Sequence, residues 1–165
     1  MADVPVICFV AAKSGTGKTT FLEKLIREMT VRGYNIGVIK SDVHGFEMDV
    51  PGKDTWRFAQ AGAKATAIIG PDKYALIQKT AQKKTLEDVT PLIQGVDIIF
   101  VEGYKAAQRP KIEVVRRELG TEVVSEVENL IAVLTDVEEL SLPVPILNIN
   151  DYQGVADLII NKYLS

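Results

Sequence analysis

The residues with the clearest chemical potential form one short loop near the N-terminus. Residues 12–20 read Ala-Lys-Ser-Gly-Thr-Gly-Lys-Thr-Thr, and they separate an apolar run from a helical pattern. This arrangement is typical of a phosphate-binding loop, because its backbone N–H groups converge on a nucleoside triphosphate. In such a loop Lys18 reaches the β and γ phosphates, the hydroxyl of Thr19 binds Mg²⁺, and the following helix adds its positive end. The pattern usually begins with glycine, and Ala12 is the smallest replacement.

Polar residues stand where further predicted strands end, at Asp42, Glu102, Asp136 and Asn148. Parallel strands end at the sheet edge where open α/β proteins bind ligands, so we predict one site there. Glu102 follows four apolar residues, as does the acid that orients Mg²⁺ through water in phosphate-loop proteins, although a polar residue can also simply end a strand. Asp42 could hold the metal's water shell, orient an attacking water or cap a turn.

Two of these strand ends are candidates for recognising the base of a nucleotide. Asp136, which follows Thr135, could accept hydrogen bonds from the paired N–H donors of guanine, which adenine lacks. Asn148 is the second candidate, and both residues could equally be turn residues. The spacing alone leaves guanine and adenine open.

The elements around these residues alternate between strands and helices. An apolar strand at 4–10, a helix from Lys18 to about Arg32 and a strand at 36–40 form a βαβ unit. Further strands are predicted at 97–101, 111–115, 130–134 and 144–147, with a helical pattern at 152–164 and two short strands, 65–69 and 74–78, around a turn. We predict an α/β, three-layer P-loop NTPase-type fold: a doubly wound, mainly parallel sheet with a short antiparallel portion, in a single nucleotide-binding domain over residues 1–165.

Composition narrows the class of protein. The chain has 165 residues, is 47% hydrophobic and carries a formal net charge of -3, which argues against a disordered protein and against a nucleic-acid partner. Cys8 is the only cysteine, and no basic segment precedes the first apolar run, which is too short to span a bilayer. We expect a cytoplasmic protein without a membrane segment. His44 is the only histidine, which disfavours a structural zinc site.

Several segments together resemble the MobB family, the molybdopterin-guanine dinucleotide biosynthesis adapter proteins. They are residues 13–20, 38–46, 49–57, 61–63 and 101–105. The resemblance implies a homodimer that binds GTP with Mg²⁺, hydrolyses it weakly at most, and works in molybdenum cofactor biosynthesis. It also implies a partner, the molybdenum cofactor guanylyltransferase, which joins GMP to molybdopterin to form the guanine dinucleotide.

The resemblance places the family's phosphate-binding residues at Gly15 to Thr20 and its metal-binding residues at Thr19 and Glu102, with Asp42 nearby, and the other candidates come from the sequence itself. The predicted nucleotide-binding residues are Lys13, Ser14, Gly15, Thr16, Gly17, Lys18, Thr19, Thr20 and Asp136. The predicted metal-binding residues are Thr19, Glu102 and Asp42, and the predicted catalytic residues are Lys18, Asp42 and Glu102. The 44–54 loop and Lys105 would face the pterin-phosphate ligand or the partner. Lys13 resembles the extra lysine of related dimeric ATPases, so it either reaches the nucleotide, across a dimer interface, or is a solvated loop lysine.

Two rival functions use the same fold. An ATP-dependent small-molecule kinase or ligase would need an arginine-bearing lid, for which the 104–117 stretch with Arg109 and Arg116 is the candidate. A metallochaperone-type GTPase would need a His/Cys cluster, and one histidine with one cysteine argues against it.

Overall fold

The computed structural model describes residues 3–42 and 44–165 and divides the chain into two compact units. The first unit consists of residues up to 41 together with 93–165, and the second consists of residues 42–92. The predicted phosphate loop and the parallel sheet both belong to the first unit. Within the described residues, no helix has the length and hydropathy needed to cross a membrane.

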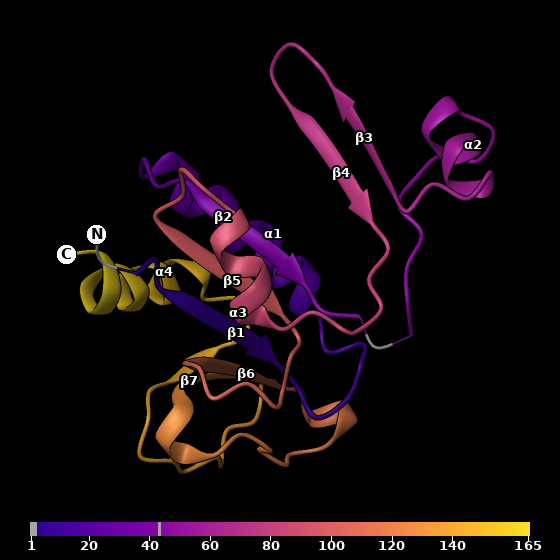
Figure 1. Cartoon of the computed structure of the whole chain (residues 1–165). Coiled ribbons are helices and arrows are strands. Elements are labelled where there is room, and N and C mark those ends of the chain that lie inside the picture. The colour runs from indigo at the N-terminus through magenta and orange to yellow at the C-terminus, as the bar shows by residue number, and fades with distance from the viewer. Residues whose placement is uncertain (1–2, 43) are drawn as a thin grey trace. The chain divides into compact units, whose positions relative to one another are not determined.

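The first unit contains a six-stranded sheet in the order β2-β5-β1-β6-β7-β8, in which every neighbouring pair is parallel (Figure 1). Its strands are β1 (Val6–Val10), β2 (Ile36–Lys40), β5 (Ile98–Glu102), β6 (Lys111–Val115), β7 (Leu130–Thr135) and β8 (Ile146–Asn148). Because β1 lies between β5 and β6, the loop that follows β1 is flanked by the chain leaving two other strands. The predicted mainly parallel P-loop NTPase-type fold is confirmed.

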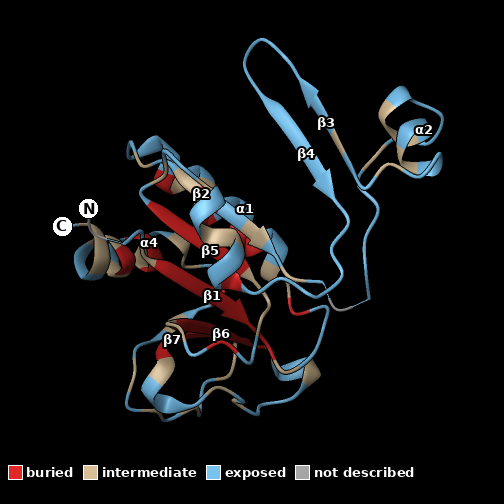
Figure 2. Cartoon of the chain, in the orientation of Figure 1, coloured by how far each residue is buried: buried red, intermediate tan, exposed pale blue. Residues whose placement is uncertain are grey.

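Two helices of the first unit build the larger core. α1 (Lys18–Val31) and α4 (Tyr152–Ile159) contact each other, and their buried side chains join those of the sheet in one cluster. The ring of Phe9 lies 6.3 Å from that of Phe21 and 5.3 Å from that of Phe100, between centroids. α4 does not continue to Leu164 as the predicted single α-helix, because the chain passes into a wider π-helical turn at Ile160–Leu164. The alternate residues of β1, such as Cys8 and Val10, are also buried, so this strand is covered on both faces (Figure 2).

The chain between β6 and β7 follows an irregular path that one buried acid holds in place. It contains two short 3₁₀ turns, η2 (Arg117–Leu119) and η3 (Val127–Asn129). Glu113 on β6 is fully buried, and its two carboxylate oxygens accept the backbone N–H groups of Val124 and Ser125, each at 2.8 Å. Glu113 therefore ties the 120–125 segment to the central sheet.

The second unit contains a separate two-stranded antiparallel sheet, β3 (Ala65–Ile69) with β4 (Tyr74–Gln78), at the predicted positions. It also contains α2 (Asp54–Gln60), α3 (Leu86–Val89) and a 3₁₀ turn, η1 (Thr90–Leu92). A capping box between Thr85 and Asp88 begins α3, and Lys53 is the N-cap of α2, whose first residue is Asp54. The hairpin leaves large apolar side chains exposed, with Ile69 85% and Tyr74 74% accessible (Figure 2).

Candidate functional site

The phosphate loop connects the end of β1 to the start of α1 and leaves its anion-binding groups open. Gly15 and Gly17 have φ angles of 76° and 88°, which glycine adopts without the steric cost of a side chain. Gly17 is the N-cap of α1, no side chain caps the helix, and its first turn contains no acid. A cavity of about 350 Å³ is lined by residues 14–20 and Glu102. The loop therefore offers free N–H groups and the positive end of a 14-residue helix to an anion.

Two of the predicted metal-binding side chains meet at this cavity. The hydroxyl of Thr19, in the first turn of α1, donates a 2.8 Å hydrogen bond to Oε1 of Glu102, the last residue of β5. The residues are 83 positions apart in sequence, and the parallel pairing of β1 with β5 brings them together. A hydroxyl and a carboxylate are hard oxygen donors of the kind that Mg²⁺ prefers beside phosphate oxygens. The donor set therefore fits a magnesium-nucleotide complex.

Lys18 lies in the same cavity and is only partly exposed. Burial lowers the pKa of Lys18, the nearby Lys105 lowers this pKa further, and Glu102 acts in the opposite direction. The ammonium group is 3.5 Å from the hydroxyl of Thr16, which is a weak contact. Phosphate oxygens in the cavity would satisfy the ammonium group of Lys18 far better than the chain alone does.

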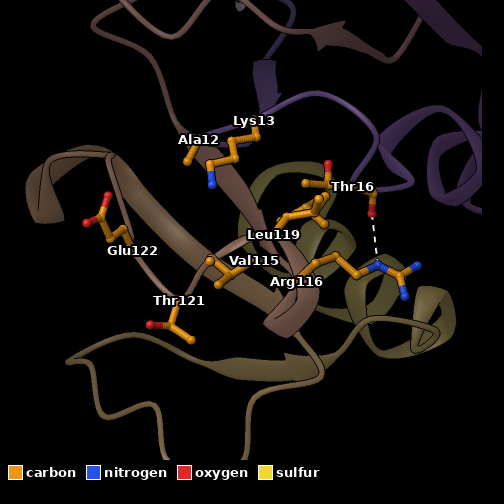
Figure 3. Close-up of a pocket in the computed structure, with 10 residues that line it drawn as sticks. Ala12, Lys13, Thr16, Val115, Arg116, Leu119, Thr121 and Glu122 are labelled. Carbon is orange, nitrogen blue, oxygen red and sulfur yellow. Dashed lines mark hydrogen bonds between the residues drawn. The ribbon is translucent and has the colours of Figure 1, made fainter.

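Two cations hold carbonyl oxygens of the phosphate loop. Nζ of Lys105 donates to the carbonyl of Ala12 at 2.8 Å, and Nε of Arg116 donates to the carbonyl of Thr16 at 3.1 Å (Figure 3). Lys105 follows a turn in which both Gly103 and Tyr104 have positive φ, 94° and 64°. Sequence reasoning assigned Lys105 to a ligand or partner and Arg116 to a possible lid. It missed these contacts, because no motif spacing signals a side chain that binds a backbone carbonyl.

The two candidates for base recognition, Asp136 and Asn148, both accept hydrogen bonds from backbone N–H groups of the chain itself. Oδ1 of Asp136 accepts the backbone N–H of Arg117 at 2.8 Å, and its Oδ2 lies 3.8 Å from Nη1 of Arg116. Oδ1 of Asn148 accepts the backbone N–H of Asn150 at 2.9 Å. The role of Asp136 in nucleotide binding stays a prediction, and its carboxylate already has partners.

Asp42 is the first residue of the second unit, whereas Lys18 and Glu102 belong to the first. Its Oδ1 accepts the backbone N–H of His44 at 2.8 Å, which is the turn-capping alternative of the sequence analysis. Its metal-binding and catalytic roles stay predictions, as does the role of the 44–54 loop. Val43, within a segment that carries the family resemblance, lies outside the described residues.

Lys13 does not line the phosphate cavity but a second one, which we call the Lys13 cavity. Its volume is about 310 Å³, and it is lined by Ala12, Lys13, Thr16, Val114, Val115, Arg116, Leu119, Gly120, Thr121 and Glu122 (Figure 3). Nζ of Lys13 lies 3.8 Å from the point that a β-carbon at Gly120 would occupy. The Lys13 cavity thus lies between the phosphate loop, the end of β6 and the segment that follows η2. Sequence reasoning did not predict this cavity.

Comparisons with known proteins agree with this geometry. Residues 6–136 match the family model described as Molybdopterin guanine dinucleotide synthesis protein B, MobB. The chain is 38% identical over 168 residues to the molybdopterin-guanine dinucleotide biosynthesis adapter protein of Escherichia coli, covering 95% of this chain and 92% of that protein. The protein of the same name from Haemophilus influenzae is 31% identical over 154 residues, with 92% and 86% covered.

Two solved structures have the same fold over nearly the whole chain. A crystal structure of Bacillus subtilis MobB superposes with a TM-score of 0.74 at 26% identity, covering 96% of this chain and 98% of that one. A MobB homolog from Bacillus stearothermophilus superposes with a TM-score of 0.69 at 25% identity, covering 96% and 97%. The phosphate loop, the Thr19–Glu102 pair and these matches lead to one conclusion: this chain belongs to the MobB family.

Proposed function

We propose that the protein is a GTP-binding accessory protein, at most a weak GTPase, that assists attachment of GMP to molybdopterin in molybdenum cofactor biosynthesis. The observation that carries the proposal is the 2.8 Å contact between Thr19 and Glu102 beside an uncapped helix start. This contact joins the two oxygen donors that a magnesium-nucleotide complex needs. The names of the relatives, which are adapter proteins of molybdopterin-guanine dinucleotide biosynthesis, supply the pathway.

The chain's own residues account for nucleotide binding and for slow hydrolysis. The N–H groups of the loop and the start of α1 bind phosphates, and the charge of Lys18 opposes the charge that develops on them. The carboxylate of Glu102 orients water or the metal's water shell, with Asp42 as the second candidate for that role. Mg²⁺ held by Thr19, Glu102 and the phosphates would neutralise further phosphate charge.

A calorimetric titration of the full chain with GTP and with ATP, each with and without Mg²⁺, tests the proposal. We expect Mg²⁺-dependent, GTP-selective binding, with turnover below about 1 per second, the lower end of ordinary enzyme rates. Lys18→Ala should abolish binding, whereas the variant of an exposed lysine six residues further along α1, Lys24→Ala, should bind like wild type. Fast ATP turnover stimulated by a small metabolite would instead support the alternative function, a P-loop small-molecule kinase or ligase.

Two interactions complete the proposal. The protein assists a molybdenum cofactor guanylyltransferase; the word adapter in its relatives' names is consistent with a protein partner, and co-purification of the two proteins tests this. It also forms a homodimer, for which the exposed apolar side chains of the β3–β4 hairpin offer a surface of the kind that subunit contacts bury. Sedimentation of wild type and Ile69→Lys measures this; a monomeric wild type would contradict it.

A further inference from the structure

The guanidinium group of Arg116 contacts the phosphate loop from outside the phosphate cavity. Its Nε donates to the carbonyl of Thr16 at 3.1 Å, as the dashed line in Figure 3 shows, and its Nη2 lies 3.2 Å from the point that a β-carbon at Gly17 would occupy. Thr16 is only 3% exposed, so this contact is made against a buried part of the loop. Arg116 lines the Lys13 cavity but not the phosphate cavity, so in this arrangement it can affect phosphate binding only through the loop.

The peptide unit between Thr16 and Gly17 carries the effect of this contact to the phosphate cavity. In a planar trans peptide the C=O and the following N–H point in opposite directions. Because Arg116 binds the carbonyl of Thr16 from outside the phosphate cavity, the N–H of Gly17 is directed away from Arg116, toward the cavity that Gly17 lines. Gly17 has a φ of 88°, and a glycine also reaches other backbone conformations at low cost. A partner for the carbonyl of Thr16 therefore selects the peptide orientation that suits an anion.

The carboxylate of Asp136 holds Arg116 in this position from the neighbouring strand. Asp136 follows β7, which pairs with β6, and its Oδ2 lies 3.8 Å from Nη1 of Arg116. Its Oδ1 accepts the backbone N–H of Arg117 at 2.8 Å, so one carboxylate fixes both the side chain of Arg116 and the backbone that follows it. The two side chains of the ion pair are 33% and 32% exposed, so solvent weakens the pair without removing it.

We propose that Arg116 and Asp136 form a positioning pair that holds the phosphate loop in its anion-binding conformation. Arg116 directs the peptide unit after Thr16, and Asp136 directs Arg116. Neither side chain touches the nucleotide, and the contribution of Asp136 to nucleotide binding passes through Arg116 rather than through a contact with the base. The proposal rests on the part of the proposed function that assigns phosphates to the loop, and it requires no particular base or pathway.

The test uses a ligand that has phosphates but no base. Wild type and variants, as full chains with Mg²⁺, are titrated calorimetrically with inorganic tripolyphosphate and with GTP. The variants are Arg116→Met, Asp136→Asn and the double variant. Arg117→Met is the control for the arginine, because it removes the same charge from the next residue and keeps the backbone N–H that Asp136 binds. Glu138→Gln, at an exposed glutamate two residues after Asp136, is the control for the carboxylate.

Both ligands should respond to the same variants. Arg116→Met should weaken each by roughly 10- to 100-fold, the range expected for the loss of a hydrogen bond from a charged donor. Asp136→Asn should weaken each by about 2- to 5-fold, as for a partly exposed ion pair, and the controls should bind like wild type. The double variant should bind like Arg116→Met, because Asp136 acts only through Arg116. Each titration is made at a temperature at which circular dichroism shows the variant to be folded, so a loss of stability alone would leave both affinities unchanged.

Several results would overturn the proposal. If Asp136→Asn lost affinity for GTP but not for tripolyphosphate, its carboxylate would contact the base. Unchanged tripolyphosphate affinity in Arg116→Met, or additive losses in the double variant, would exclude the pair. Equal losses in Arg116→Met and Arg117→Met would show an effect of charge alone.

Failure of the proposed function is separately visible. In that case wild type binds tripolyphosphate without selecting GTP over ATP, and the tripolyphosphate series still decides the role of the pair. A wild type that binds neither tripolyphosphate nor GTP would overturn both proposals.

Discussion

Glu113→Gln tests whether a single buried carboxylate holds the segment that borders the Lys13 cavity. Glu113 is fully buried, and each of its oxygens accepts one backbone N–H at 2.8 Å, from Val124 and from Ser125. Glutamine keeps one acceptor oxygen and places an NH₂ group opposite the second N–H. One hydrogen bond to a charged group is lost, which costs about 1.5–3 kcal/mol, and two donors are brought together.

We therefore expect Glu113→Gln to lower the free energy of unfolding by roughly 2–3 kcal/mol, or about 4–12 °C in melting temperature for a chain of this size. Urea unfolding followed by circular dichroism measures the loss, and Glu128→Gln, an exposed glutamate on the same connection, is the matched control. Amide exchange should speed up most at Val124 and Ser125. A variant within about 0.5 kcal/mol of wild type, the range of ordinary surface substitutions, would refute the anchoring role.

Three further predictions concern the phosphate loop. Gly17→Ala should destabilise the chain by about 1–2 kcal/mol and weaken nucleotide binding, because φ is 88° and the new methyl group would lie 3.2 Å from Nη2 of Arg116; thermal melts and calorimetry check both. Lys105→Met should weaken GTP binding by freeing the carbonyl of Ala12, and Lys105→Arg should restore part of it; equal affinity in Lys105→Met and wild type would contradict this. Nucleotide affinity should be constant at pH values below the lowered pKa of Lys18 in the free protein and should fall as the pH rises through that pKa. Bound phosphates raise the pKa of Lys18, so above its free pKa nucleotide binding must take up a proton. An affinity that does not change at alkaline pH would exclude a role for the charge of Lys18.

Much of the central architecture could be predicted from the sequence because its signals are local. An apolar run, small loop residues and an amphipathic helix define β1, the phosphate loop and α1 within 31 residues. The partnership of Thr19 with Glu102 is long-range, yet it was predictable. The helix that begins with Lys18 and Thr19 follows the loop after β1, Glu102 ends β5, and a parallel sheet brings the ends of these two neighbouring strands to one edge.

The contacts that the sequence did not predict depend on irregular backbone. Lys105 reaches Ala12 only because Gly103 and then Tyr104 adopt positive φ, and a tyrosine in that region is not signalled by its residue type. The segment after β6 has no periodicity, and its path depends on the hydrogen bonds of the buried Glu113, so the Lys13 cavity beside it could not be predicted. For Asp136 the sequence predicted the position at the end of a strand but not the partners of its carboxylate, which are the guanidinium group of Arg116 and the backbone N–H of Arg117.

These contacts have a common consequence for how the phosphate loop works. A loop that must present N–H groups to an anion has to direct its carbonyl oxygens elsewhere, and a carbonyl left without a partner would favour a rearranged loop. Here the carbonyls of Ala12 and Thr16 are bound by cations from the chain after β5 and after β6, the two strands that flank β1. The central place of β1 therefore does more than position the loop at the sheet edge. It places a segment with a cationic side chain, Lys105 or Arg116, on each side of the loop. Folding of the chain therefore already orders much of the loop, which lowers the conformational entropy that nucleotide binding would otherwise lose.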